Sequence, residues 1–504
     1  MRINSFLEAS QTIFTNSTFY LGIYSDIFLI IVILLLLLYF VFIDFISKYK
    51  FISYTLITQI SIICVLILTM LIFNESYLTF YNFSFLLNNT FFNNSVKKLI
   101  IFFFIMLLLL SINYFKFEQV FKFEYYILVF LSLLGLFIII NSYDLISMYL
   151  GIELQSLCFY ILATFKPYNN FSGEAGLKYF ILGAFSSGML LFGCSLLYGI
   201  TGLTNFYELE LFFQIMDNSY FLNSLIISIF FILIGLFFKL SAAPFHMWAI
   251  DVYEGSPTLV TAFFSIIPKI GILTLLLKFF FFLFNLYWNY FNQFILISIF
   301  LSLIIGTFSA LLQVKLKRIL AYSGVTHVGF LLLGLSINTI EGFYSVFFYM
   351  VIYMLLSLTL FSIILSIYKW NTYLKIKHIS EVILLFKGNS ILSFLFGLTL
   401  FSIAGIPPLI GFYSKFYVFV AAIQVKYYFL VLVAALISVI STIYYIRLIK
   451  LMFFKNINYY LFFKPIPIQN TLIISFFFLF NIFFLLWPNI CVLVLHNILL
   501  SVFI

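Results

Sequence analysis

The sequence predicts an all-α polytopic membrane protein with about fourteen transmembrane helices. Hydrophobic residues make up 65% of its 504 residues and charged residues only 8%, which excludes a water-soluble globular domain. The mean hydropathy of +1.21 supports the same conclusion. Unbroken apolar runs, such as Ile27 to Ile43, suit helices that cross a bilayer, which need about 20 residues. A membrane β-barrel would instead show alternating segments of about ten residues.

The spans are joined by short connections and are therefore expected to form one continuous helical bundle. Apolar runs between polar breaks define each span. In chain order the predicted spans are 24–44, 51–73, 98–115, 124–142, 144–165, 174–202, 220–248, 256–282, 290–312, 318–338, 343–368, 390–420, 424–450 and 468–497.

Charged residues alternate from loop to loop, which predicts an even number of spans and one common side for both termini. The loops expected to face the matrix or cytoplasm carry Lys48, Lys50, Lys116, Lys122, Lys166, Lys315, Lys317, Arg318, Lys375, Lys377, Lys387, Arg447, Lys455 and Lys464. The opposite loops carry Glu208, Glu210, Asp217 and Glu341. Lys97, Lys98, Asp251 and Glu254 do not fit this pattern.

Two spans contain proline-bearing interruptions, at Phe238 to His246 and at Ala404 to Gly411. Proline inside a helix removes a hydrogen bond and clashes with the preceding turn, so each helix is predicted to break there. Paired interruptions in two halves of a transporter point to inverted repeats and to the transport site. The alternative is a pair of ordinary proline kinks.

Ionisable residues inside the spans are the main functional signal. A charged side chain at the bilayer centre costs about 2.5–3.5 kcal/mol and usually marks an ion or proton pathway. Glu153 needs a cationic partner or a hydrated pocket, and Lys239 is its natural partner. Lys269 has apolar residues on both sides, and Lys415 follows the second interruption. The alternatives are a protonated acid that tightens helix packing and lysines that extend to the interface.

Lys178 lies one turn after a predicted helix start. It either takes part in transport or only extends its amine to the membrane–water interface. His327 is a candidate relay because imidazole titrates near neutral pH, and a buried structural histidine is the alternative. His246, beside the first interruption, is likewise either a proton relay or a buried structural histidine. His378 and His496 are expected in loops or at the end of the chain.

Motifs for redox and nucleotide chemistry are not visible in the sequence. There is no GxGxxG after a strand and no Walker A motif, so neither NADH nor ATP has an expected site. Four scattered cysteines without CxxC spacing suggest neither zinc nor an iron–sulfur cluster. The net charge of +9 reflects loop lysines and arginines, so no nucleic acid partner is expected. The chain is predicted to move charge without generating the driving force.

Six segments together resemble the antiporter-like subunits of respiratory complex I, over roughly residues 120–450. They are Gly151 to Leu157, Gly173 to Phe185, Phe238 to Trp248, Asp251 to Thr258, Lys317 to Ser323 and Ala404 to Phe412. The segment Asp251 to Thr258 resembles the branch called subunit 2, or subunit N in bacteria. Lysine at position 415 and the chain length also fit that branch better than its two sister subunits.

The resemblance implies two inverted five-helix repeats, each with a broken helix, at 120–285 and 286–455. N-terminal helices over 1–119 and a C-terminal helix over 456–504 complete the chain. The resemblance further implies that Glu153 and Lys239 form an ion pair and that Lys269 is the central proton carrier. Lys415 would serve the exit channel, Lys178 would lie near the proton-uptake path, and His327 would be the weakest assignment.

The resemblance also implies a proton-pumping subunit of NADH:ubiquinone oxidoreductase, with no redox centre or cofactor of its own. FMN, iron–sulfur clusters and ubiquinone are expected in partner subunits. Expected partners are other membrane-arm subunits, including neighbouring antiporter-like subunits, and the bilayer with cardiolipin. A multisubunit cation/proton antiporter and a non-catalytic scaffold are the alternatives.

The composition favours an AT-rich organellar gene, because phenylalanine (73) and tyrosine (35) are abundant. Together with the resemblance, this predicts a multi-pass protein of the mitochondrial inner membrane. A bacterial plasma membrane is the alternative, and relatives also occur in chloroplasts.

Overall fold

The computed structural model describes residues 24–46, 54–75, 80–82, 86–118, 123–166, 169–215, 219–282, 287–368, 377–455 and 463–503. Helices dominate these residues. The first half holds α2 (Tyr24–Ile46), α3 (Tyr54–Asn74), α4 (Phe91–Glu118), α5 (Glu124–Asn141), α6 (Leu145–Ala163), α7 (Asn170–Thr201), α8 (Phe206–Ile215), α9 (Ser219–Leu240), α10 (Met247–Gly255) and α11 (Thr258–Phe282). The second half holds α12 (Trp288–Leu312), α13 (Leu316–Leu335), α14 (Ile340–Ser366), η1 (Ile379–Leu384), α15 (Leu385–Gly388), α16 (Ser390–Ala404), α17 (Ile410–Gln424), α18 (Tyr428–Phe454), α19 (Ile468–Leu486) and α20 (Pro488–Phe503).

The prediction of an all-α membrane protein is confirmed. Among the described residues, twelve helices are long and apolar enough to cross a membrane, and they match twelve of the predicted spans. The other two predicted spans, 390–420 and 468–497, are each occupied by two shorter helices, α16 with α17 and α19 with α20. The count of fourteen and the repeats remain predictions.

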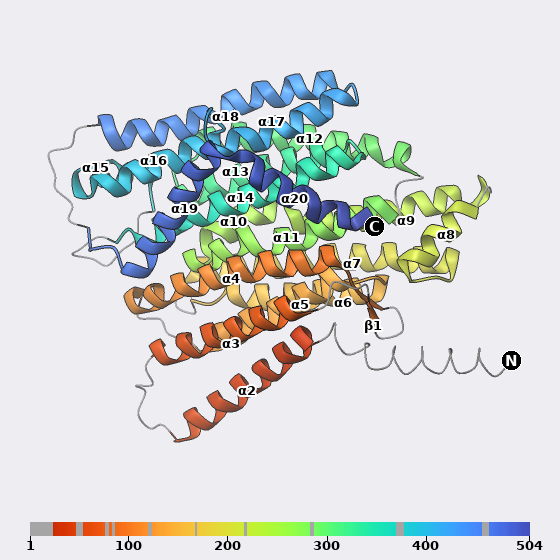
Figure 1. The fold of residues 1–504 in the computed structure, drawn as a ribbon, viewed down its shortest axis with the longest axis horizontal. Coiled ribbons are helices and arrows are strands. Elements are labelled where there is room, and N and C mark those ends of the chain that lie inside the picture. The colour runs from red at the N-terminus through yellow and green to blue at the C-terminus, as the bar shows by residue number, and fades with distance from the viewer. Residues whose placement is uncertain are drawn as a thin grey trace.

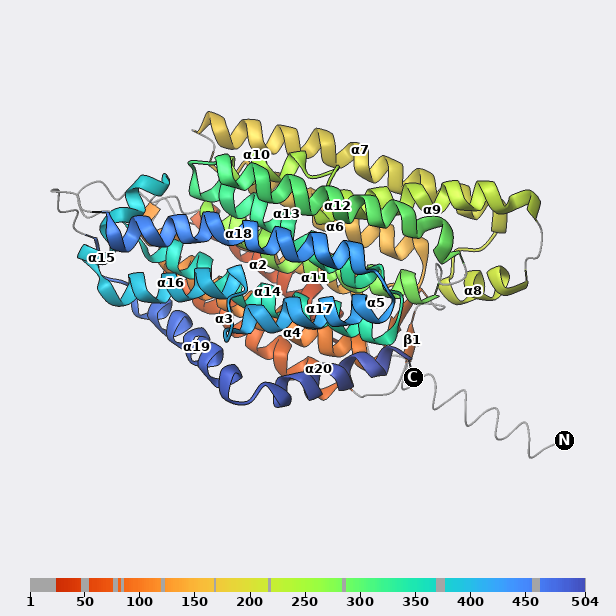
Figure 2. The same cartoon turned by 90° about the horizontal axis from the view of Figure 1, so that it is seen from above.

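The helices form one elongated bundle with a buried central group. Figure 1 shows them side by side from α2 and α3 at one edge to α18 at the other, and Figure 2 shows α7 along one flank and α19 with α20 along the other. The span of α11 is 100% buried, whereas that of α18 is only 28% buried. α14 packs against α11, α13, α16 and α17, so the central helices hold most of the interior.

A small hairpin closes one end of the bundle. β1 (Phe80–Asn82) pairs antiparallel with β2 (Leu87–Asn89), and Leu87 also bridges to Ser142 between α5 and α6. This end holds the start of α2 and the end of α20 (Figure 1). The prediction that both termini share one side is not tested, because residues 1–23 lie outside the described residues. Lys48, Lys50, Lys122, Lys375 and Asp217 lie outside the described residues.

Two of the four residues that do not fit the charge pattern, Glu254 and Lys97, have structural explanations. Glu254 is hydrogen-bonded by Lys315 and Arg318, so the acidic residues of α10 neutralise basic ones on the same side. Lys97 is fully buried and lies 3.6 Å from Asp26 at the opposite end of the bundle. The excess of lysine and arginine on one side of a membrane concerns residues in exposed loops, so it does not apply to a buried lysine that is paired with a carboxylate.

Candidate functional site

The first interruption places Lys239 in the interior. α9 ends at Leu240, and Ser241 adopts a left-handed conformation with φ of 63°. The indole Nε1 of Trp248 donates a 2.8 Å hydrogen bond to the carbonyl of Phe238, which the broken helix leaves without its usual partner. Trp248 in turn stacks on Tyr179 at 4.7 Å between ring centroids. The predicted break is thus confirmed, and aromatic residues hold it rigidly.

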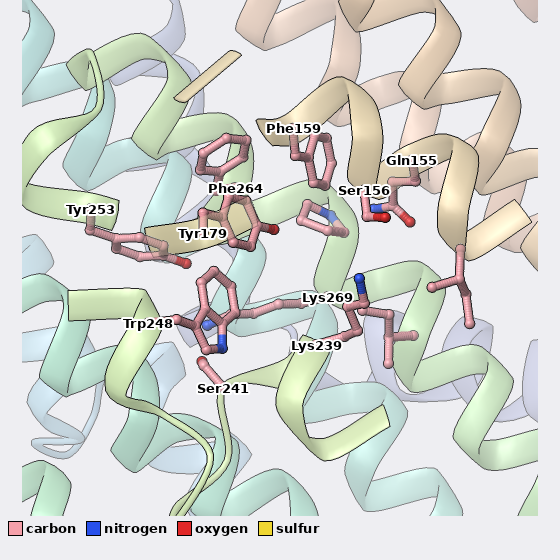
Figure 3. A pocket seen from close by; sticks show the side chains of 13 residues that line it. Gln155, Ser156, Phe159, Tyr179, Lys239, Ser241, Trp248, Tyr253, Phe264 and Lys269 are labelled. Carbon is pink, nitrogen blue, oxygen red and sulfur yellow. The ribbon is translucent and has the colours of Figure 1, made fainter. Parts of the chain in front are cut away.

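A small cavity of about 20 Å³ lies between Lys239 and Lys269. Figure 3 shows the two lysine side chains beside this cavity with their amines pointing in different directions, with Tyr179 and Trp248 on one side and Ser156 and Gln155 on another. A cavity needs about 10–15 Å³ to hold one water. One water molecule therefore fits in this cavity, which is lined by both lysines and by the polar side chains of Ser156 and Gln155.

Glu153 and Lys239, although both lie in the described part of the chain, form no direct ion pair, contrary to the implied arrangement. Lys239 Nζ instead lies 3.4 Å from the hydroxyl of Tyr160, two turns further along α6 than Glu153. Glu153 receives a 3.4 Å hydrogen bond from Ser156, and its Oε1 is buried without a hydrogen-bond partner. The two opposite charges still attract each other through space.

Lys269 is 3% exposed and lies on the fully buried helix α11. Its Nζ donates a 3.2 Å hydrogen bond to the hydroxyl of Tyr353 on α14. Gly324 on α13 faces the amine, because a methyl group there would lie only 3.3 Å from Nζ. The absent side chain at Gly324 leaves room for the lysine head group.

His327 continues the line from Lys269. Its imidazole packs on the ring of Tyr353 at 4.8 Å between centroids, and its Nδ1 lies 2.7 Å from the hydroxyl of Tyr349. Its Nε2 is buried without a hydrogen-bond partner. A small cavity of about 10 Å³ is lined by His327, Tyr353 and Lys415.

The second interruption holds Lys415. α16 ends at Ala404, Gly405 adopts a left-handed conformation with φ of 85°, and α17 begins at Ile410. Lys415 Nζ donates a 2.7 Å hydrogen bond to the carbonyl of Ala404, the last residue of α16. The helix end carries a partial negative charge, which suits an ammonium group. Both broken helices therefore place a lysine beside the break.

These side chains form one continuous set, which we call the buried row. The buried row consists of Lys239, Lys269, His327 and Lys415. Tyr353 contacts both Lys269 and His327. Lys239 and Lys269 line the first cavity, and His327 and Lys415 line the second. The sequence analysis selected all four residues but not the tyrosines that connect them.

Lys178 lies apart from the buried row. Its Nζ is 2.7 Å from Glu174 and 2.8 Å from Asp251, and its side chain is 44% exposed. Together with Lys315 and Arg318 these residues line a cavity of about 160 Å³ on the side of the basic loops. Lys178 is thus part of a surface charge network.

Two further buried lysines were missed as candidates. Lys97 was assigned to a loop, and Lys278 lies nine residues after Lys269 within the same predicted span. The signal for Lys278 was present, since it interrupts an apolar run as Lys269 does. Among the residues that the structure describes, no group of three or more His, Cys, Asp or Glu could hold a metal ion.

Residues 142–441 match the family described as NADH:quinone oxidoreductase/Mrp antiporter, TM. This region covers more than half of the chain and contains the whole buried row. The chain belongs to this family. The resemblance drawn from the six sequence segments is therefore confirmed.

Curated relatives within this family are similar over most of their length. The chain is 46% identical to NADH-ubiquinone oxidoreductase chain 2 of Marchantia polymorpha, covering 77% of this chain and 79% of the relative. It is 39% identical to NADH-quinone oxidoreductase subunit N of Parvibaculum lavamentivorans, covering 75% and 77%. This family member is therefore an antiporter-like subunit of the chain 2 and subunit N type.

Solved structures share the fold at lower identity. A chain of respiratory complex I from Thermus thermophilus matches with a TM-score of 0.75 and 22% identity, over 93% of this chain and 98% of that one. A chain of the Mrp complex from Dietzia matches with a TM-score of 0.77 and 17% identity, over 94% and 97%. The fold of this family member is thus that of the membrane subunits of such complexes.

These similarities confirm the expected localisation and assign the chain to a complex. With twelve long apolar helices and close plant relatives, this family member is a multi-pass protein of the mitochondrial inner membrane. It is a subunit of an NADH:quinone oxidoreductase complex and has partner subunits in the membrane.

Proposed function

We propose that this chain translocates protons along the buried row, driven by NADH oxidation and ubiquinone reduction in partner subunits. The observation that carries the proposal is the continuity of the row. Lys239 and Lys269 share one cavity, Lys269 reaches Tyr353, Tyr353 packs on His327, and His327 shares a second cavity with Lys415. Lysine, imidazole and phenol groups joined by water can pass protons from one to the next.

Each member of the row has a distinct role in this proposal. Lys239 is the first carrier, and the charge of Glu153 alters its proton affinity because the two groups attract each other without direct contact. Lys269 is the central carrier, and its proton passes through Tyr353 toward His327. Lys415 delivers the proton beyond the second break.

Lys178 would act at the surface rather than in the row. Its network with Glu174 and Asp251 lies on the side of the basic loops and lines a cavity large enough for several waters. Exposed carboxylates and amines exchange protons readily with solvent. We therefore assign Lys178 to proton uptake on that side.

The driving force comes from elsewhere in the complex. FMN, iron–sulfur clusters and ubiquinone belong to partner subunits in this proposal, and this chain holds no redox centre of its own. Conformational and electrostatic coupling through neighbouring antiporter-like subunits would change the Glu153–Lys239 attraction and shift the next proton along the row. Lipids such as cardiolipin would cover the apolar surface. The division into two inverted repeats is part of the same proposal.

The alternative, a subunit of a cation/proton antiporter, is less favoured. The curated relatives that reach 39–46% identity are NADH-ubiquinone and NADH-quinone oxidoreductase subunits, whereas the Mrp chain, at 17% identity, shares the fold alone. The scaffold alternative leaves Lys239, Lys269 and Lys415 without a carboxylate in ion-pair distance among the described residues, which is energetically costly for a role in helix packing alone.

The test is proton pumping by the intact complex in sealed vesicles, with NADH oxidation followed in parallel. Lys269→Ala should depress pumping and coupled electron transfer while assembly is retained. Lys269→Arg sharpens the test, because arginine keeps the positive charge but does not release its proton. Normal pumping in both variants, in a fully assembled complex, would overturn the proposal.

A further inference from the structure

A second cluster of buried charges lies away from the buried row, near the hairpin end of the bundle. Its ionisable members are Asp26, Glu75, Lys97 and Lys278, from α2, the end of α3, α4 and α11. Lys97 is 0% exposed and Lys278 6% exposed, although each lies within two turns of a helix end. Lysines in such positions usually extend to the interface, and these two do not.

Lys97 and Asp26 form the paired part of the cluster. Lys97 Nζ lies 3.6 Å from Asp26 Oδ1 and 3.4 Å from the hydroxyl of Ser25. Asn141, the last residue of α5, donates a 3.2 Å hydrogen bond to the other oxygen of Asp26. Glu75 accepts a 3.3 Å hydrogen bond from the backbone N–H of Ser25. Three helices thus meet at one buried ion pair.

Lys278 has no carboxylate partner in the described part of the chain. Its Nζ donates hydrogen bonds to the carbonyls of Ile140 and Ser142 at the end of α5, the latter at 3.4 Å. The negative end of the α5 dipole favours the ammonium form. The end of α5 links Lys278 to the ion pair, because Asn141 donates to Asp26 and the carbonyl of the next residue, Ser142, accepts from Lys278.

Unpartnered amide oxygens indicate that water belongs in this region. The side-chain oxygens of Asn88, Asn93, Asn94 and Asn141 are buried without a hydrogen-bond partner. Buried polar groups are almost always paired with protein or ordered water. Asn93 and Asn94 lie one turn before Lys97 on α4, on the same side of the helix. Ordered water at these amides would therefore reach the ion pair.

The cluster lies between the buried row and the end of the bundle that holds the start of α2. Lys278 is nine residues after Lys269 on α11, which corresponds to about 13.5 Å along the helix axis and to the opposite helix face. The cluster is therefore a separate site. The hairpin lies over it, because Leu87 bridges to Ser142, whose carbonyl accepts from Lys278.

We propose that Lys278, Lys97 and Asp26 form a second proton-exchange site, which releases protons to the membrane side opposite the basic loops. In this step the N–H bond of protonated Lys278 breaks, water takes the proton, and the Asp26 carboxylate stabilises the resulting hydronium ion before the proton leaves toward that side. The neutral amine of Lys278 then accepts the next proton, delivered by water from the row. This inference rests on the proposed proton translocation.

Lys278→Arg in the intact complex is the first experiment. Arginine keeps the cation and its donors to the Ile140 and Ser142 carbonyls but does not release a proton. A positioned proton-transfer group contributes about 10²–10⁴-fold to a rate, so pumping should fall roughly tenfold or more with assembly intact. Lys98→Arg, in the neighbouring position on α4, is the matched control and should pump normally.

The outcomes separate the two proposals. If Lys269→Arg abolishes pumping and assembled Lys278→Arg pumps normally, the cluster is structural and this inference fails alone. If neither substitution affects pumping, the proposed function fails as well. Should Lys278→Arg not assemble, Asp26→Asn replaces it, because asparagine keeps the shape and removes the charge. Normal pumping by assembled Asp26→Asn would also overturn the inference.

Discussion

Tyr353 contacts both Lys269 and His327, because its hydroxyl accepts a 3.2 Å hydrogen bond from the lysine while its ring packs on the imidazole. Lys269 lies on α11, His327 on α13 and Tyr353 on α14, so the contact spans three helices. Tyr353 is therefore the connection on which the proposed path depends most.

Tyr353→Phe should slow proton pumping by roughly tenfold or more, with little effect on assembly, because it removes one hydroxyl and keeps the packed ring. The measurement is pumping by vesicles that contain the intact complex, normalised to NADH oxidation. Tyr344→Phe on the same helix is a suitable control, since the Tyr344 hydroxyl donates a 3.4 Å hydrogen bond to the carbonyl of Val492, which is not part of the buried row. Equal pumping in both variants would show that protons do not pass through Tyr353.

The fold could largely be predicted from the sequence because lipid-facing and buried helices are both apolar along their whole length. The prediction was weakest where a helix starts with polar residues. Span 98–115 is in fact α4, Phe91–Glu118, because Asn93, Asn94 and Lys97 resemble a loop although they are buried against neighbouring helices. The hairpin and α8 were not predicted, since short elements give little periodic signal.

The ionisable residues of the buried row could be predicted from the sequence, but the tyrosines that contact them could not. A lysine in an apolar run is conspicuous because its burial is costly, so Lys239, Lys269 and Lys415 were identified. The tyrosines were not, because this chain has 35 of them and tyrosine suits a membrane helix without any function. The implied Glu153–Lys239 ion pair was wrong in its geometry, since Tyr160 occupies the position beside the amine.

Gly411→Ala should destabilise the second break. A methyl group at this position would lie 1.7 Å from the carbonyl oxygen of Ser402, and backbone does not yield as a flexible side chain does. Overpacking of this kind costs about 1–3 kcal/mol or more. The thermal unfolding temperature of the purified complex should fall. Gly188→Ala is the control, because its methyl group would meet nothing within 4 Å. Equal stability of the two variants would contradict the tight packing of α16 against α17.

Glu254 should make the contact between α10 and α13 sensitive to acid. Burial raises the pKa of Glu254, but hydrogen bonds from Lys315 and Arg318 outweigh it and hold the pKa below the usual range. The carboxylate therefore stabilises the folded state above the ordinary glutamate pKa, and this contribution is lost as the pH falls through the depressed value. Unfolding temperatures of wild type and Glu254→Gln should differ at neutral pH and converge at acidic pH. A constant difference at all pH values would exclude the charge as the cause.

Glu153→Gln should slow pumping without releasing Lys239 from its place. Lys239 is held by Tyr160, not by Glu153, so the neutral amide leaves the position of the amine unchanged and removes only the attraction through space. Coulomb energy at longer range is modest, and the expected loss of pumping is smaller than that of Lys269→Arg. Glu153→Asp keeps the charge and should pump nearly as wild type does. A Glu153→Gln loss as complete as that of Lys269→Arg would mean that the carboxylate itself carries the proton.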